Sequence, residues 1–279
     1  MNYREPLSQR AVAISISASP DMAVLGLGQE HLDDAMTEVA RHLLAMGSRL
    51  LYGGDLREQG FSRLLFELVA RHRRDADLGD ERVGVSNYLA WPVHAQLSTA
   101  RLVELSEALK GSAEVFCLGP DGTVLSVEAR GVVTAAPATD TEWADGLTAM
   151  RVAMRAASDA RIVLGGIVEG FKGRMSGVAE EALLALQGGQ PLFLLGGFGG
   201  CAQDIAVELG LVVDTSAPFR TWPGRDRFAA FSVGNLQNGL TADENKVLAA
   251  TVHIDQAVAL VLRGLLRREK IASRELDDE

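Results

Sequence analysis

The sequence of 279 residues lacks the features that mark a secreted, membrane or disulfide-stabilised protein. It has only two cysteines, Cys117 and Cys201, and each lies near an apolar run, which favours a reduced intracellular compartment. No apolar run approaches the ~20 residues that span a bilayer, and the N-terminus lacks the apolar core of a signal peptide. We therefore expect a cytoplasmic protein with no membrane partner.

The sequence also lacks an excess of basic residues, since its formal net charge is −10. This charge argues against nucleic acid as a partner, although local Arg, Lys and helix N-termini can still bind an anionic small molecule. A chain of this length, 47% hydrophobic and 23% charged, can bury a large core without disulfides or metal.

Several catalytic signatures are missing as well. There is no P-loop, no G-x-S-x-G elbow, and no visible Ser or Cys nucleophile with a paired His. His31, His42, His72 and His253 show no metal-ligand spacing. We predict no metal site, no cofactor and no ATP hydrolysis.

What is present is an alternation of short apolar runs with helical patterns, which predicts an α/β, Rossmann-like fold. The sheet should be mostly parallel and covered by helices on both faces. Predicted strands are 11–17, 49–55, 85–93, 113–119, 160–166 and 191–197, with a hairpin-like excursion at 123–129 and an edge strand at 211–215. Predicted helices are 31–47, 61–75, 98–111, 142–158, 176–188 and 200–209.

The C-terminal part is predicted to be looser. A loop over 216–227 precedes a long helix over 241–268, which begins with a Thr241/Glu244 capping box and has a break near His253. We expect one domain over 1–279, with its core at 11–215 and residues 216–279 as an extension. The apolar stripe of the long helix packs either on the sheet or on another subunit; it comprises Val247, Leu248, Ile254, Val258, Val261, Leu262 and Leu265.

Three predicted strands end in glycine pairs, Gly53-Gly54, Gly165-Gly166 and Gly196-Gly197. Ligands in open α/β sheets bind at the carboxyl ends of strands, where glycine lets the backbone approach them closely. Ser17 ends another strand, and Asp55 follows the first pair. The alternative is that the glycines only allow tight turns.

The stretch 161–186 is the most informative. After Gly165-Gly166 comes a basic, glycine-rich loop, and then a helix that starts with acidic residues and points its free N–H groups at the same place. The residues expected to bind ligand here are Lys172, Gly173, Arg174, Gly177, Glu180 and Glu181. Arg151 and Arg155, four apart on the preceding helix, form a possible phosphate clamp or are simply solvated charges.

Other side chains have structural explanations beside functional ones. His94 is either a pocket residue or a satisfied structural histidine, and the second is favoured. The two cysteines are expected to be small buried hydrophobes. The aromatic residues that could stack on a base, but would by default pack in the protein, are Trp91, Phe171, Phe198, Trp222 and Phe231.

The order of YGGD (52–55), MRAASDARIVLGG (154–166) and GVAEEALLALQGGQPLFLLGG (177–197) resembles the SLOG superfamily across residues 11–210. That superfamily joins "lonely guy" phosphoribohydrolases, DprA-like proteins and the sensor domains of TRPM-type channels and Thoeris antiviral defence effectors. The matching residues are Met154, Ser158, Asp159, Gly165, Gly166, Glu180, Glu181 and Gln190-Pro191.

The sequence departs from the phosphoribohydrolase pattern in three places. Leu164 stands where that pattern has proline, the short G-x-G-T loop is replaced by IVEGFKGRMSG, and Arg151 matches the family arginine only with a one-residue slip. An alternative match of GGFGGC (196–201) would put Gln203 in place of the glutamate. The long basic loop is similar to the sensor branch, which implies an ADP-ribose-type ligand, a homo-oligomer and a separately encoded effector.

Two further functions stay open. In an N-glycosidic hydrolase acting on a nucleotide, Glu180 or Glu181 would stabilise positive charge at the ribosyl carbon and Arg151 would hold the phosphate. In an assembly protein, the C-terminal helix would supply the interface. Free base released from a nucleotide would identify the enzyme, whereas tight binding without turnover would identify the sensor.

Overall fold

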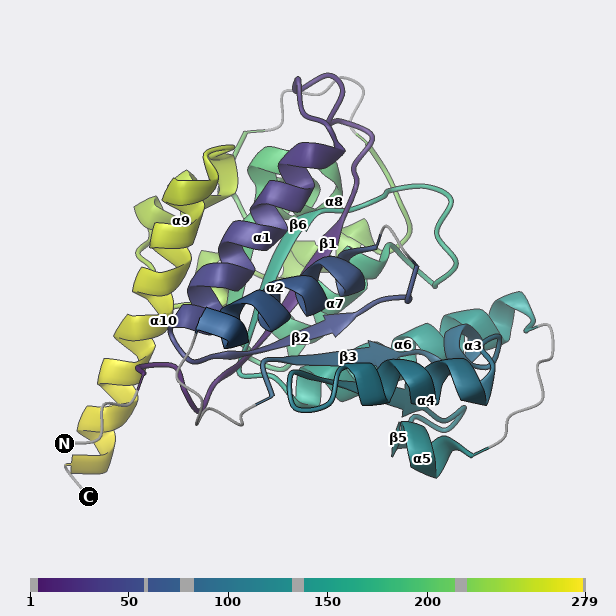
Figure 1. Cartoon of the computed structure of the whole chain (residues 1–279). Coiled ribbons are helices and arrows are strands. Elements are labelled where there is room, and N and C mark those ends of the chain that lie inside the picture. Colours follow the sequence, from purple (N-terminus) through teal and green to yellow (C-terminus); the bar gives the residue numbers. More distant parts are fainter. Residues whose placement is uncertain (1–4, 58–59, 76–82, 132–137, 214–219, 278–279) are drawn as a thin grey trace.

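The computed structural model describes residues 5–57, 60–75, 83–131, 138–213 and 220–277, with the backbone alone for 73–75 and 272–277. These residues form a seven-stranded sheet in the order β5-β4-β3-β2-β1-β6-β7, in which only β5 runs antiparallel to its neighbour (Figure 1). The strands are β1 (Ala11–Ser17), β2 (Arg49–Gly53), β3 (Val85–Leu89), β4 (Ala113–Leu118), β5 (Val124–Ser126), β6 (Ala160–Gly165) and β7 (Leu192–Leu195).

Helices cover both faces of this sheet, which confirms the predicted Rossmann-like α/β class. They are α1 (Gln29–Ala45), α2 (Phe61–Asp75), α3 (Trp91–His94), α4 (Thr99–Ala108), α5 (Val127–Arg130), α6 (Asp140–Ala156), α7 (Gly177–Gln187), α8 (Gly200–Glu208), α9 (Ala242–Ala250) and α10 (Ile254–Asp277). Short 3-10 helices lie at Gly196–Phe198, Arg225–Ala230 and Val233–Leu236.

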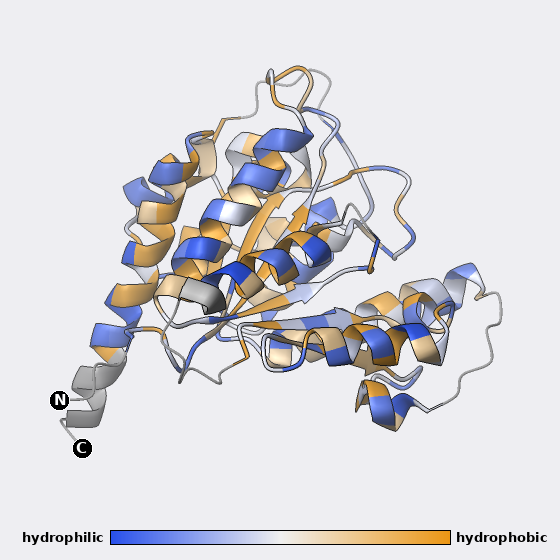
Figure 2. Ribbon diagram, viewed as in Figure 1, coloured by the Kyte–Doolittle hydropathy of each residue, from blue (hydrophilic) through white to orange (hydrophobic). Residues whose placement is uncertain are grey.

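Alternation along β1 and β6 divides the core into two layers. Val12, Ile14 and Ile162 face the layer that contains α1, α2 and α10, whereas Ala13 faces α6 and Val163 faces α7 and α8. Figure 2 shows the strands as an apolar centre, with the polar sides of the helices turned outward. This alternation is what period-two side-chain geometry requires of a strand that is buried on both faces.

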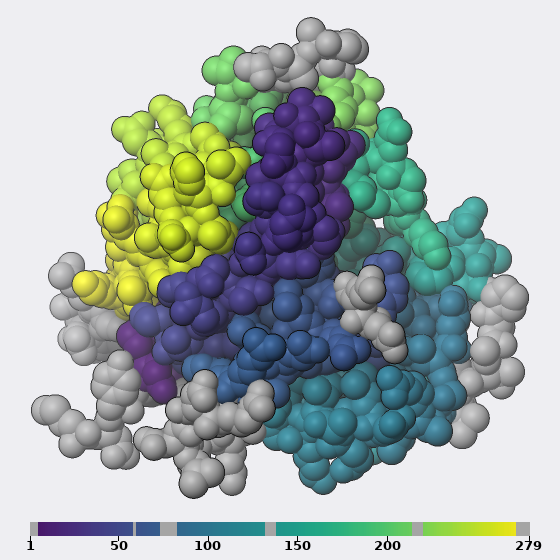
Figure 3. All heavy atoms as spheres, turned by 45° about the horizontal axis from the view of Figure 1, so that its top comes forward, coloured from purple at the N-terminus to yellow at the C-terminus, as the bar shows by residue number. Residues whose placement is uncertain are grey.

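The long C-terminal helix is broken as predicted, at Thr251–His253, into α9 and α10. Val258, Val261 and Leu265 are buried in the same cluster as α1, and Figure 3 shows the C-terminal helices lying beside the N-terminal one. Their apolar stripe therefore packs on the chain itself, although Val247 stays 42% exposed.

Local signals place the helix ends correctly. The Ser98 hydroxyl accepts a hydrogen bond from the Arg101 N–H at 3.2 Å, and Thr241 and Glu244 form the predicted capping box. Gly47, with φ +85°, follows α1 in the left-handed conformation that glycine adopts at low cost.

Three predicted elements are wrong in part. The strand 85–93 stops at Leu89, because Pro92 cannot donate to a ladder and instead starts the helical turn α3. The excursion 123–129 forms a hairpin strand only to Ser126, whose side chain caps α5. Residues 211–213 of the predicted edge strand are not extended in the sheet, since the Leu211 N–H bonds to Ala206 O at the end of α8; 214–215 lie outside the described residues.

The loop prediction at 216–227 also needs correction, because Arg225 already belongs to the 3-10 helix that runs to Ala230. Residues 216–219 lie outside the described part of the chain.

Candidate functional site

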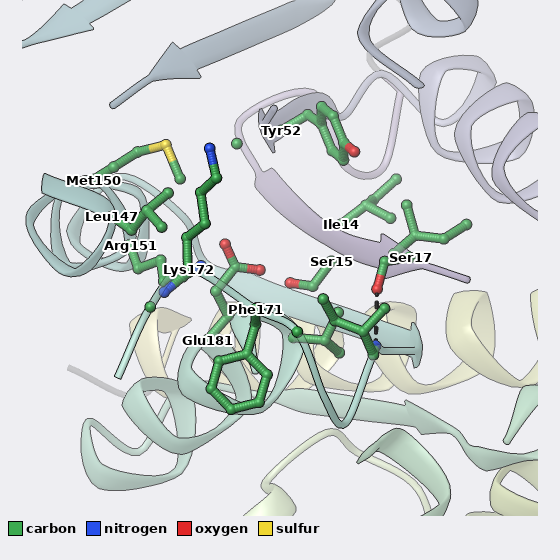
Figure 4. A pocket seen from close by; sticks show the side chains of 17 residues that line it. Ile14, Ser15, Ser17, Tyr52, Leu147, Met150, Arg151, Phe171, Lys172 and Glu181 are labelled. Atoms are coloured by element: carbon green, nitrogen blue, oxygen red, sulfur yellow. Dashed lines mark hydrogen bonds between the residues drawn. The ribbon is translucent and has the colours of Figure 1, made fainter. Parts of the chain in front are cut away.

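A cavity of about 310 Å³ lies at the carboxyl end of β1, between α6 and the loop from β6 to α7 (Figure 4). The chain continues from β1 to β2 on one side and places β6 on the other, so the cavity sits where the strand order reverses. Such a switch point is where open α/β sheets bind ligands. The lining comprises Ile14, Ser15, Ile16, Ser17, Tyr52, Gly53, Leu147, Met150, Arg151, Ile167, Gly170, Phe171, Lys172, Gly173, Gly177, Val178 and Glu181.

Arg151, from α6, forms one of two buried ion pairs beside the cavity. Its Nη1 bonds the Glu180 carboxylate on α7, and the other oxygen of Glu180 accepts a 2.6 Å hydrogen bond from the Thr148 hydroxyl. A Cβ at Gly177 would lie 2.7 Å from Arg151 Nη2, and one at Gly173 would lie 3.1 Å from Nη1. The glycines therefore let the loop close around the guanidinium.

Glu181, one residue on, forms the second pair. Its Oε2 lies 3.0 Å from Nη1 of Arg161, a fully buried side chain on β6 that also donates to the Ser15 hydroxyl at 2.7 Å. Figure 4 shows the Glu181 carboxylate turned toward Ser15 and Lys172. Burial lowers the pKa of Arg161, and the positive charge of Arg151 lowers it further, while the Glu181 charge opposes both effects.

The two ion pairs leave donors unused. Arg151 Nε, Arg161 Nε and Arg161 Nη2 are buried and have no hydrogen-bond partner in the described structure. A buried donor without an acceptor costs about 1–3 kcal/mol, and more when it is charged. The charges around the cavity are the three cations Arg151, Arg161 and Lys172 and the two carboxylates of Glu180 and Glu181, so one positive charge is in excess.

Tyr52 closes the cavity on the β2 side. Its hydroxyl has no partner among the described residues, and burial, followed by the negative charge of Glu181, raises its pKa well above the usual range. On the opposite side, the Ser17 hydroxyl accepts the Ile167 N–H at 3.3 Å and fixes the start of the loop. Ser17 and the loop thus enclose the space that Tyr52 faces.

A wider cleft of about 580 Å³ adjoins the cavity and shares four lining residues with it, Gly53, Leu147, Met150 and Lys172. The predicted ligand residues Gly54 and Asp55 line this cleft rather than the cavity. Lys172 Nζ lies 3.9 Å from the centre of the Trp143 ring, on the cleft side of the boundary.

The structure brings together most of the residues that the sequence predicted for a ligand site. Around the cavity or the cleft lie Ser17, Gly53, Gly54, Asp55, Arg151, Lys172, Gly173, Gly177 and Glu181, with Glu180 directly behind Arg151.

The other predicted residues line neither space. Arg155 donates to Gly188 O at 2.7 Å, and Arg174 pairs with Asp145 on the surface. Gly165 and Gly166 have positive φ. A Cβ on Gly165 would lie 2.2 Å from Ser17 O, and a Cβ on Gly166 would lie 2.2 Å from Cys201 Sγ. A Cβ on Gly196 would lie 2.6 Å from Ala249 O, and a Cβ on Gly197 would lie 2.1 Å from Thr251 O. The geometry of these four glycines is that of close packing.

Sequence reasoning missed Tyr52, Ser15, Arg161 and Trp143. An arginine inside the apolar strand ARIVLGG was a usable signal for Arg161, because a charge on a buried strand requires a partner nearby. Tyr52 and Ser15 carried no such signal, since both fit an ordinary strand.

His94 occupies the structural role that was favoured for it. Its Nε2 lies 2.8 Å from Leu118 O, and its Nδ1 accepts from Arg130 Nε at 3.0 Å. Because Nε2 then carries the proton, the imidazole is neutral, and burial lowers its pKa. Cys117 and Cys201 are free and buried, as expected.

Within the described ranges, no group of three or more His, Cys, Asp or Glu side chains is arranged to hold a metal ion. A search of the same residues for a helix long and apolar enough to cross a membrane found none.

Comparison with known families decides the relationship. The family model described as SLOG cluster2 matches residues 6–233, which is most of the chain. The protein belongs to this SLOG family. The match covers every strand of the sheet and both ion pairs of the cavity, and membership indicates nucleotide-related binding or processing. No curated protein matches the SLOG chain described here.

Proposed function

We propose that this SLOG protein binds a nucleotide-derived, ADP-ribose-like ligand in the cavity between β1, α6 and the 167–177 loop. The observation that carries the proposal is the pair of cationic side chains, Arg151 and Lys172, that line the cavity and leave the charges around it with a positive excess. Phosphate and ribose hydroxyl oxygens are acceptors that fit such donors. The volume of about 310 Å³ falls in the range of small-molecule sites.

The roles of the side chains follow from their pairing. Of the three cations around the cavity, Lys172 is the one without a carboxylate partner among the described residues, so it can bind a phosphate. Glu181 faces the cavity and can accept hydrogen bonds from ribose hydroxyls. Glu180 is held by Arg151 and Thr148 and acts by positioning Arg151.

Isothermal titration with AMP, ADP-ribose, NAD and, as a control, adenosine tests the proposal. We expect at least one phosphate-bearing compound to bind and to raise the melting temperature, because a ligand that binds only the folded state stabilises it. Adenosine should bind at least tenfold more weakly, a difference of about 1.4 kcal/mol. No binding by any of the phosphates at millimolar concentration would overturn the proposal.

A second candidate is an N-glycosidic hydrolase, favoured by the position of the Glu181 carboxylate in the cavity. In that reaction the bond between the ribosyl carbon and the base breaks and its electrons leave with the base. Water adds to the carbon as hydroxyl, and the proton that water loses ends on the departing base. Glu181 would stabilise the oxocarbenium-like centre. Release of free base that is lost in Glu181→Gln but kept in Glu104→Gln, an exposed control on α4, would establish the enzyme. Bound and intact nucleotide would exclude it.

We also propose that the protein self-associates and that its ligand-bound form signals to a separate effector, as SLOG sensors of antiviral defence do. The apolar stripe of α10 does not supply an interface for this, because it is packed against α1. The support for the proposal is therefore the resemblance alone. Sedimentation showing only monomer at micromolar concentration, with and without ligand, would remove the proposal.

A further inference from the structure

We propose that the cleft beside the cavity receives the base of the same ligand, with Trp143 as the surface on which the base stacks. This inference rests on the proposed function, because it assumes that the ribosyl phosphate occupies the cavity. It adds that the base of the nucleotide is recognised, that the base lies in the cleft, and that Trp143 contacts it.

The two spaces are continuous. They share Gly53, Leu147, Met150 and Lys172, so a ligand can extend from one to the other past the Lys172 side chain. Figure 4 shows Lys172 extended between Met150 and Leu147 on one side and the Glu181 carboxylate on the other. The cavity of about 310 Å³ suits a ribosyl phosphate, and the cleft of about 580 Å³ has room for a planar ring system.

The chemistry of the cleft differs from that of the cavity. Its walls are largely apolar, formed by Leu56, Val93, Leu97, Leu147, Met150 and Trp143. Asp55 pairs with Arg57, with Nε 2.6 Å from Oδ2, so these two opposite charges compensate each other. Apart from Lys172, the cleft therefore has no excess charge among its lining residues, and it suits an uncharged aromatic group better than a second phosphate.

Trp143 gives the cleft its preference for a planar aromatic group. It is half-buried near the start of α6 and lines the cleft, where the flexible Lys172 side chain places its ammonium over the ring. A base that stacks on this ring displaces the ammonium. Stacking of a base on an aromatic side chain is favourable for every base, and the displaced ammonium gains a phosphate of the same ligand as partner.

The test compares ribose 5-phosphate with AMP, which share the ribosyl phosphate and differ by the base. In the unmodified protein, AMP should bind at least about tenfold more tightly than ribose 5-phosphate. Trp143→Ala should remove most of that difference while leaving the affinity for ribose 5-phosphate within about twofold. Trp143→Phe, which keeps a ring, should restore it. Val152→Ala is the matched control, because Val152 is on the same helix, is 48% exposed and lines neither space.

A second measurement does not depend on the folding of the alanine variant. Trp143 fluorescence in the unmodified protein should change on addition of AMP and not of ribose 5-phosphate, and this change should disappear in Trp143→Phe, which leaves Trp91 and Trp222 in place.

The outcomes separate the two proposals. Equal affinity for AMP and ribose 5-phosphate, or an equal loss of both in Trp143→Ala, overturns the base site and leaves the ribosyl phosphate site standing. Binding of neither compound, together with no binding of ADP-ribose, overturns the proposed function and the base site with it.

Discussion

Arg161 is a fully buried cation, and its environment explains why the cavity is built around charge. It has one carboxylate, Glu181, and one hydroxyl, Ser15, but two of its nitrogens find no acceptor in the described structure. Removing one partner of a buried ion pair costs about 3–5 kcal/mol, so Glu181 and Arg161 hold each other in place.

Gly177→Ala tests whether the loop positions Arg151 for the ligand. The new Cβ would lie 2.7 Å from Arg151 Nη2, so the guanidinium must move away from its present place. We expect about tenfold weaker binding of ADP-ribose by calorimetry, with a small change in melting temperature, because the contact is with the far end of a side chain. Gly234→Ala is the control, since a Cβ there has only Ser232 Oγ nearby, at 3.7 Å. Unchanged affinity in Gly177→Ala would show that Arg151 does not contribute.

The thiols give a second residue-scale prediction. Burial raises the pKa of Cys117 to about 11 and that of Cys201 to about 12, so neither forms a thiolate at about pH 8. Both should resist a disulfide reagent such as DTNB in the native protein, and both should react in denaturant. A thiol that reacts rapidly under native conditions would contradict the buried positions.

The residues that the sequence predicted and those it missed differ in what a linear pattern can record. Lys172, Gly173 and Gly177 lie in one glycine-rich loop, so their grouping was visible in the chain. Arg161, Ser15 and Tyr52 come from three strands and meet only through the register of β1 with its neighbours. Arg155 was predicted with Arg151 because the two are four positions apart on one helix. Helical spacing cannot show that Arg155 bonds Gly188 O at the end of α7 and does not line the cavity.

At the scale of elements, capping signals were the most reliable guide. Thr241 and Glu244 form the predicted capping box at α9. Thr139 and Glu142 form another at α6, which starts at Asp140 and not at the predicted residue 142. The strand ends were less predictable. The apolar run 85–93 contains no break before Pro92, and only the three-dimensional turn at Ala90 shows that β3 has already ended.

Glu244 provides the element-scale prediction, because it links α9 to α10. Arg267 and Arg263 donate to its carboxylate, as does the Thr241 N–H, and the hydrogen bond from Arg267 is the largest cause of a pKa lowered to about 2. A carboxyl with a lowered pKa stabilises the folded state above its ordinary pKa of 4.5, and the contribution is lost as the pH falls toward 2.

Glu244→Gln should therefore lower the melting temperature at neutral pH by about 2 °C, a modest value because exposed ion pairs are screened by solvent. The difference from the unmodified protein should vanish near pH 2. Glu104→Gln, on an exposed pair within α4, should change the melting temperature much less. A difference that does not depend on pH would show that the loss comes from packing rather than from the charge.

At the scale of the whole molecule, the C-terminal helices and the sheet share a core. Leu248 and Val261 belong to the same buried cluster as β1 and α1, and Arg10 Nε lies 2.5 Å from Glu269 Oε1 on α10. We therefore predict that the chain unfolds in one cooperative calorimetric transition, with equal van't Hoff and calorimetric enthalpies. Two separated transitions would divide the chain into independent domains near residue 216, where the sequence placed the end of the core.

The location of the cavity follows from topology. β1 is an interior strand of the sheet. The chain leaves it on one side for β2 and returns on the other as β6, and the crevice between these connections holds Arg151, Glu181 and Lys172. The order of strands and helices predicted a site at this edge of the sheet, whereas the division into a charged cavity and an apolar cleft required the positions of α6 and the 167–177 loop.

A crystal structure of the protein grown with millimolar ADP-ribose would locate the ligand. We expect phosphate density within hydrogen-bonding distance of Arg151 or Lys172, a ribose hydroxyl at Glu181, and the base beside Trp143 in the adjoining cleft. ADP-ribose bound at another place on the molecule, with the cavity holding only water, would show that the cavity is not the ligand site.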